Sequence, residues 1–165
     1  MPHDYEIWIF IHIIGVVALA AGLEMSLSTF VMMRRAKTVQ EVRVWASLGK
    51  IISQYQVIPV SALVLVLSGA YLVDKFNLEW SMGWISWSLI AVVYATAVGL
   101  GFITPRMKDI GATAGPAPDG PVPAALAEKL NDPMLFGAIH GNLTIVLGIL
   151  WNMTTQPGGI QAFLA

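Results

Sequence analysis

The sequence predicts an all-α integral membrane protein, an antiparallel four-helix bundle with both termini on the outer, periplasmic side. Three observations predict this fold. Only 12% of the 165 residues are charged, against about 25% in a soluble domain. Four segments are apolar and long enough to cross a hydrocarbon core. The basic residues gather in two of the three connections between these segments, which is typical of cytoplasmic loops.

The four segments are predicted as helices because a backbone in lipid must satisfy its own hydrogen bonds. They lie within a single membrane domain, residues 1–165, and span about 5–35, 39–74, 84–104 and 132–155. The first segment begins MPHDYE, which is acidic where a signal peptide is basic. We therefore expect it to be retained as a membrane helix.

The connections also carry local signals. Residues 38–54 mix polar and apolar side chains, so they form either a cytoplasmic extension of the second helix or a surface helix with a basic face. Residues 111–123 read GATAGPAPDGPVP, which predicts a flexible cytoplasmic loop over about 106–131. Asn131, Asp132 and Pro133 supply a cap and a first-turn proline for the fourth helix.

The basic residues predict the orientation. Eight of the nine fall between helices one and two or between helices three and four, and one lies on the other side: Arg34, Arg35, Lys37, Arg43, Lys50, Arg106, Lys108 and Lys129 against Lys75. The positive-inside rule then places both loops in the cytoplasm. We expect a multi-pass protein of the bacterial inner membrane.

Composition excludes several functions. The chain has no cysteine, which excludes disulfides, thiolate metal sites and a cysteine nucleophile. A net charge of −1 argues against a nucleic-acid partner. The expected partners are the lipid bilayer and either other membrane subunits or further copies of the chain. No catalytic residue can be named, and whether the protein is an enzyme stays open.

His12 is the first candidate functional residue. It lies about two turns into the first helix, and Gly15 and Gly22 follow on the same helical face. An imidazole beside a strip of small residues has two interpretations. Small residues allow close helix packing, with the histidine bonded across the contact. Alternatively, they leave room for a flat porphyrin whose iron the imidazole binds.

His140 in the fourth helix shows the same arrangement, with Gly137 and Gly141 beside it. The two histidines predict haem b binding, with His12 and His140 as axial ligands. Because the two helices are antiparallel, we expect the histidines in opposite leaflets, about 15 Å apart in depth. A strongly tilted haem, two haems, or a sixth ligand such as Met25 or Met134 would accommodate this separation better than one upright haem.

Glu24 is the second ionisable group in the first helix. A charged carboxylate cannot face lipid at low cost, so Glu24 is expected to be protonated, paired with His140, or directed into a polar gap.

Several short motifs together resemble a known family. They are His12 followed by glycines, the pair Arg34-Arg35, the run Leu67-Ser68-Gly69-Ala70-Tyr71-Leu72 after Pro59, and Asn152-Met153 before Pro157. The chain resembles an uncharacterised family of bacterial four-helix integral membrane proteins. More distantly, it is similar to the copper-resistance D membrane domain and to the membrane protoporphyrinogen oxidase. The resemblance implies haem b ligation by a histidine of the first helix, which here is His12.

Three functions compete at this stage. The first is a haem b-binding protein in electron transfer or a redox subunit. The second is a cofactor-free structural subunit of a larger membrane complex, in which the small residues make protein contacts. The third is a metal-handling or transport protein, which the scarcity of clustered ligands weakens.

Overall fold

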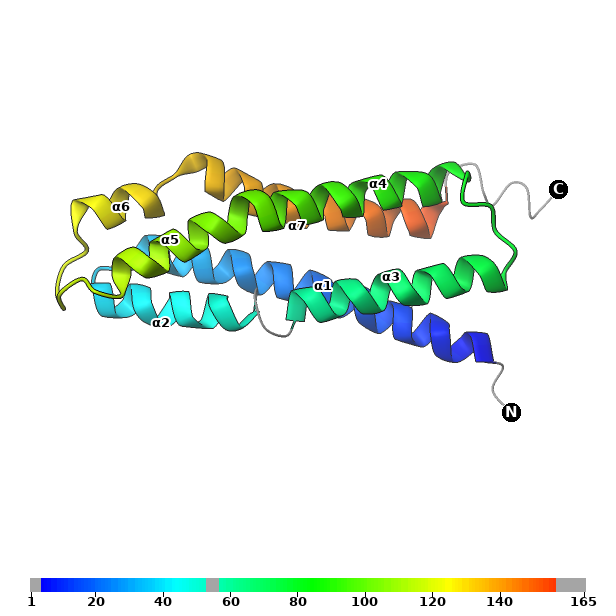
Figure 1. Ribbon diagram of the computed structural model, residues 1–165, viewed down its shortest axis with the longest axis horizontal. Coiled ribbons are helices and arrows are strands. Elements are labelled where there is room, and N and C mark those ends of the chain that lie inside the picture. Colours follow the sequence, from blue (N-terminus) through cyan, green and yellow to red (C-terminus); the bar gives the residue numbers. More distant parts are fainter. Residues whose placement is uncertain (1–3, 53–56, 157–165) are drawn as a thin grey trace.

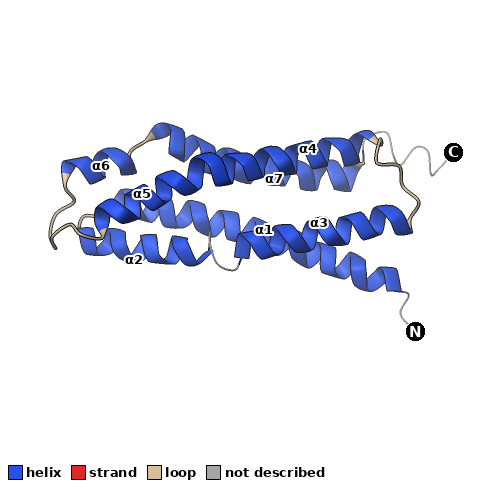
Figure 2. Cartoon of the chain, in the orientation of Figure 1, coloured by secondary structure: helices blue, strands red, loops and turns tan. Residues whose placement is uncertain are grey.

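The computed structural model of the chain describes residues 4–52 and 57–156. Its elements, in chain order, are the helices α1 (Asp4–Arg35), α2 (Val39–Lys50), α3 (Val57–Lys75) and α4 (Gly83–Val98), the π-helix η2 (Gly99–Ile103), and the helices α5 (Thr104–Ala114), α6 (Ala124–Leu130) and α7 (Pro133–Thr155). The described part of the chain contains no strand, so the all-α prediction is confirmed (Figure 2).

Four stretches are long and apolar enough to cross a membrane: Tyr5–Arg35, Ile58–Lys75, Gly83–Ala114 and Ala124–Thr155. They run side by side along the long axis of the molecule, and α2 continues the line of α3 (Figure 1). The start of α1 and the end of α7 lie at the same end of the bundle. The prediction of an antiparallel bundle of four spanning helices is therefore confirmed.

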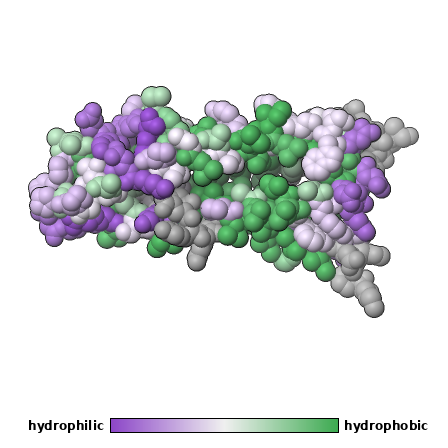
Figure 3. Space-filling model, in the orientation of Figure 1, coloured by the Kyte–Doolittle hydropathy of each residue, from purple (hydrophilic) through white to green (hydrophobic). Residues whose placement is uncertain are grey.

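The surface changes character along the bundle. Hydrophobic residues gather over the half that contains α3 and α4, whereas hydrophilic residues gather over α2, α5 and α6 (Figure 3). With 19 residues, α3 is about 28 Å long, close to the ~30 Å thickness of a hydrocarbon core. We call this stretch the membrane half. The opposite end, formed by α2, α5, α6 and the end of α1, carries all the basic residues of the two predicted cytoplasmic loops, and we call it the basic end.

The largest buried cluster lies at the basic end. It joins residues of α1, α2, α5, α6 and α7: Leu27, Phe30, Met33, Val39, Val42, Ile110, Ala114, Leu126, Leu130, Leu135 and Ile139. Burial of apolar side chains is driven by water, so a conventional core is expected where the exterior is polar. In the membrane half many large apolar side chains are exposed instead, among them Phe10, Val17 and Val93.

The expected flexible loop over 106–131 is wrong as a description of this segment. The third spanning helix does not end near residue 104, because η2 carries it into α5, and α6 forms a further helix. Ile110 and Ala114 of α5 and Leu126 and Leu130 of α6 are buried at four-residue spacing. Tertiary burial of such a face stabilises short helices that their glycine and proline content would otherwise disfavour.

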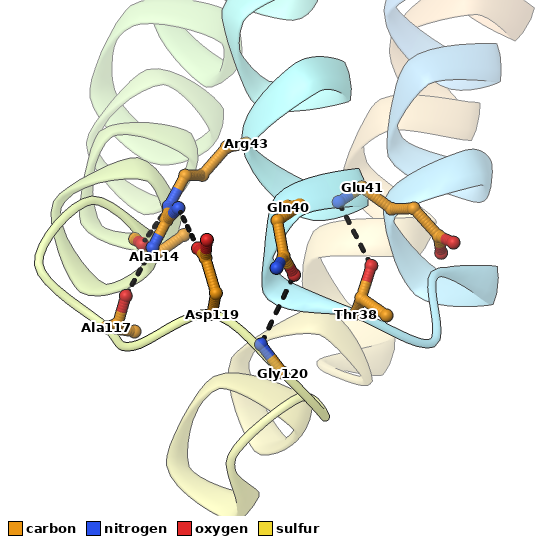
Figure 4. A network of polar contacts seen from close by, with 8 residues as sticks. All are labelled: Thr38, Gln40, Glu41, Arg43, Ala114, Ala117, Asp119 and Gly120. Carbon is orange, nitrogen blue, oxygen red and sulfur yellow. Dashed lines mark hydrogen bonds and ion pairs between the residues drawn. The ribbon is translucent and has the colours of Figure 1, made fainter.

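The connection between α5 and α6 is tied to α2 (Figure 4). The Arg43 guanidinium donates to the carbonyls of Ala114 and Ala117 and pairs with Asp119 at 2.7 Å. The backbone N–H of Val39 donates to the Gly120 carbonyl at 2.9 Å. Gly120 has φ of +138°, which a residue with a side chain rarely adopts. One arginine thus supplies hydrogen-bond donors to two backbone carbonyls of the connection.

The predicted second helix over 39–74 corresponds to α2 and α3, which lie on either side of residues 53–56. Residues 53–56, over which that helix was expected to continue, lie outside the described residues. The predicted start of the fourth helix is confirmed: the Asp132 carboxylate accepts hydrogen bonds from the backbone N–H groups of Met134 and Leu135, and Pro133 is the first helical residue.

The core at the basic end can be tested with two phenylalanines of α1. Phe30 is fully buried, whereas Phe10 is 62% exposed on the membrane half. We expect Phe30→Ala to lower the free energy of unfolding in detergent by about 3–5 kcal/mol. Phe10→Ala, the matched control, should leave it nearly unchanged. Equal losses in reversible denaturation experiments would contradict this placement of the core.

A candidate site around His12

His12 of α1 faces α3. Its Nδ1 atom lies 2.9 Å from the hydroxyl oxygen of Ser68. Gly69 follows Ser68, and a Cβ atom at this glycine would lie only 3.2 Å from the Cε1 atom of His12. Absence of a side chain at residue 69 therefore allows α3 to approach the imidazole ring closely.

The hydrogen bonds of Ser68 determine which imidazole nitrogen carries the proton. Ser68 Oγ lies 2.6 Å from the carbonyl oxygen of Val64, and two oxygens this close must share a hydrogen. The serine has one hydroxyl proton, which it donates to Val64, so toward His12 it acts as acceptor. His12 then donates from Nδ1, and in the neutral imidazole Nε2 is left as the acceptor nitrogen.

Two cavities in the membrane half meet at His12. The first has a volume of about 320 Å³ and extends between α3 and α4 toward the end of α7. The second, of about 260 Å³, lies between α1 and α7. Five residues line both: His12, Leu65, Val92, Ile149 and Met153. We call this pair the His12 cavities. Their walls are almost entirely apolar, and His12 is the ionisable side chain among the residues that line them.

The wall of the first cavity on the α4–α7 side is fixed by polar contacts. Asn152 of α7 donates to the Trp84 carbonyl at 2.7 Å and to Ser88 Oγ at 3.0 Å. The Ser88 hydroxyl in turn donates to the same Trp84 carbonyl. Polar groups in hydrocarbon lack water as a partner, so these bonds hold α7 against the first turns of α4.

Gly15 and Gly22, predicted to make room for a cofactor, do not line the His12 cavities. A Cβ atom at Gly15 would lie 3.3 Å from Val64 and 3.4 Å from the backbone of Leu65. The space beside this glycine is therefore filled by α3, in agreement with the helix-packing interpretation for this residue. Gly22 is also buried.

His140 is not brought together with His12. It is exposed on α7 and contacts Phe136, with ring centroids 4.7 Å apart. The structure places no atom within 4 Å of a Cβ at Gly137 or Gly141, so the strip beside His140 is open.

The separation of the two histidines follows from the helix register. Ile149 and Met153 of α7 line both cavities together with His12, and they lie nine and thirteen residues after His140. At 1.5 Å per residue, His140 is therefore about 14–20 Å from the level of His12 along the bundle, close to the expected ~15 Å. They cannot ligate one iron.

Glu24 lies near the edge of the membrane half. Gly15 contacts Leu65 of the antiparallel helix α3, eight residues after α3 begins at Val57. Glu24 lies nine residues after Gly15 along α1, so it is level with the start of α3. Its side chain is exposed and accepts a hydrogen bond from Ser28 at 3.3 Å. A carboxylate at this level reaches the interfacial region, where its charge is tolerated far better than in hydrocarbon.

Sequence reasoning missed Met153 as a neighbour of His12. The two methionines considered as sixth ligands, Met25 and Met134, are exposed and do not line the His12 cavities, whereas Met153 lines both. Ser68 and Gly69 were noticed only as part of a family motif. Nothing in one sequence gives the register that places them against His12.

The comparisons with known proteins identify a family. The profile of a family described as predicted integral membrane protein (DUF2269) matches residues 6–157. The chain belongs to this family. No curated protein and no solved structure gives a significant match.

Membership supports the membrane location and the resemblance to an uncharacterised membrane family. The match extends over every residue of the His12 cavities named above. The more distant similarities to the copper-resistance D domain and to protoporphyrinogen oxidase stay predictions. The chemistry of the site has to be argued from its geometry.

The contact between His12 and Ser68 can be tested by stability. Ser68→Ala removes the side-chain acceptor of the Nδ1 proton, so we expect the free energy of unfolding in detergent to fall by about 1–2 kcal/mol. Ser28→Ala removes a serine hydroxyl that is exposed on α1, and should change it by less than about 0.5 kcal/mol. Equal effects would contradict the proposed hydrogen bond.

Proposed function

We propose that this protein binds haem b in the His12 cavities, with His12 as an axial ligand, and acts in electron transfer or as a redox subunit. The observation that carries the proposal is the Nδ1 contact with Ser68, which leaves Nε2 of a cavity-lining imidazole as the available nitrogen. A metal-binding histidine commonly has its second ring nitrogen held in this way.

The residues present fit a haem better than a bare metal ion. The described residues contain no group of three or more His, Cys, Asp or Glu side chains that could hold a metal ion. A porphyrin supplies four nitrogen ligands itself, so one imidazole is sufficient to anchor its iron. The apolar walls suit a macrocycle, and Met153, which lines both cavities, supplies a thioether of the kind that serves as a sixth ligand.

The chain's own residues would then have distinct tasks. Ser68 orients the imidazole and fixes its tautomer. Gly69 leaves the space that this orientation needs. Leu65, Val92 and Ile149 would keep water away from His12 and from a macrocycle bound beside it. A bound haem would supply one-electron chemistry, and its potential would depend on the ligands and on the low polarity of these walls.

A cofactor-free structural subunit is the second candidate. It is favoured by Gly15, which contacts α3 directly, and by the open small-residue strip beside His140 on α7. In that role the chain would present α7 to another subunit or to a second copy. No observation on the described residues favours the metal-handling or transport function.

We further propose that the basic end is cytoplasmic and that both termini are periplasmic, in a bacterial inner membrane. The basic residues support this orientation because eight of nine lie at one end.

Absorption spectra test the haem proposal. We expect the full-length protein, expressed with added haem precursor and purified in detergent, to show haem b bands in a reduced-minus-oxidised spectrum. His12→Ala should lose at least about nine-tenths of the bands, because the anchoring nitrogen is gone. His140→Ala is the matched control: an exposed histidine is removed and the bands should persist.

Other results would redirect the proposal. A colourless protein that remains folded would overturn haem binding and favour the structural role. Loss of about half of the bands in each histidine variant would assign a haem to His140 as well, and would contradict a single haem at His12.

Labelling tests the orientation, and the absence of native cysteine makes this straightforward. Ser81→Cys lies in the connection between α3 and α4, and Ala125→Cys lies in α6 at the basic end; both positions are exposed. A membrane-impermeant maleimide should label Ser81→Cys in spheroplasts, and Ala125→Cys only after the membrane is opened. The reverse pattern would invert the proposed topology.

A further inference from the structure

A separate cavity lies at the basic end. It has a volume of about 470 Å³ and is formed between α2 and α5. Small residues make the space, among them Gly49, Gly111 and Gly115. A Cβ atom at Gly111 would meet nothing within 4 Å, so the helix backbone itself forms part of the wall.

The charged residues that line this cavity are all cations: Arg43, Lys50 and Lys108. Arg43 is already matched by Asp119 and by two carbonyls. The nearest carboxylate in sequence to Lys108 is Asp109, which pairs with Lys129 at 2.8 Å. Among the described residues that line the cavity there is no carboxylate. Lys50 and Lys108 therefore bring ammonium groups to a cavity whose described lining is cationic.

The cavity adjoins the membrane half. Helix α2 ends at Lys50, and α3 begins at Val57, which marks the edge of the membrane half. Val44, Leu48 and Ile51, at spacings of four and three residues, place exposed apolar side chains on the outward side of α2 beside this cavity. The apolar strip suits the acyl chains of a lipid, and the cationic cavity beside it suits an anionic headgroup.

We propose that the cavity between α2 and α5 binds the phosphate headgroup of an anionic phospholipid, with its acyl chains against Val44, Leu48 and Ile51. Lys50 and Lys108 supply the charge that selects an anionic headgroup, as basic pockets between membrane helices do. A free phosphate would share the lysines but not the apolar strip, so the two sources of the phosphate group can be separated by experiment.

The test uses the full-length protein in detergent and native mass spectrometry, with added phosphatidylglycerol or phosphatidylcholine of identical acyl chains. Phosphatidylglycerol should bind at a lower concentration than phosphatidylcholine. The double variant Lys50→Gln, Lys108→Gln should weaken phosphatidylglycerol binding about tenfold or more. Lys37→Gln combined with Lys75→Gln removes the same charge from residues that do not line the cavity, and should bind as the native protein does.

A second variant addresses the space rather than the charge. Gly111→Leu places a side chain where a Cβ meets no atom, and leucine favours a helix more than glycine does, so the variant should fold. It should weaken phosphatidylglycerol binding while all cations remain.

The outcomes are decisive for the site and for the ligand. Equal binding of the two lipids, or equal effects of the two double variants, would overturn the proposal. Full displacement of phosphatidylglycerol by millimolar inorganic phosphate would reassign the cavity to a free anion. None of these results depends on haem binding at His12.

Discussion

The change of solvent along the bundle is the constraint on which the rest of the structure depends. Over about the length of α3 the chain faces hydrocarbon, and beyond that level its exterior is polar. Water drives apolar side chains inward only where water is present. The large buried cluster around Phe30 and Met33 therefore lies at the basic end, whereas the membrane half keeps Phe10 and Val93 on its outside. The same boundary accounts for Glu24, whose carboxylate lies at the level where hydrocarbon ends.

Within the membrane half, specificity comes from a few polar contacts rather than from burial. His12 with Ser68 joins α1 to α3, and Asn152 with Ser88 joins α7 to α4. Asn142 adds a further bond between α7 and the Ala95 carbonyl, just before η2. In hydrocarbon an unmade hydrogen bond has no water to replace it, so each contact restricts the register of one helix pair. The buried Oδ1 atom of Asn142 has no hydrogen-bond partner among the described residues, which is an uncommon arrangement.

The sequence was sufficient for the class of fold because composition and segment length alone decide it. It predicted the cap at Asp132 for a similar reason, since the cap residue and the helix it begins are adjacent. It failed over residues 106–131, where glycine and proline suggested a loop but Ile110 and Leu126 bury against distant helices. It also could not separate the glycines: Gly15 and Gly137 look alike in sequence, yet one packs on α3 and the other faces open space. Helix rotation decides between these outcomes, and a lone sequence does not contain it.

The His12 cavities follow from how the helix pairs are joined. Polar contacts hold α1 to α3 and α4 to α7 within the membrane half, while α1 and α7, one helix of each pair, join in the buried cluster at the basic end. Between the pairs, the residues that face one another at the level of His12 are aliphatic side chains and Met153, which make no directional contacts. Dispersion alone is then available to close this gap, and in lipid it brings little advantage over contact with acyl chains. Space beside the imidazole is thus a consequence of where the hydrogen bonds were placed, and Ser68 determines which nitrogen of His12 keeps a lone pair.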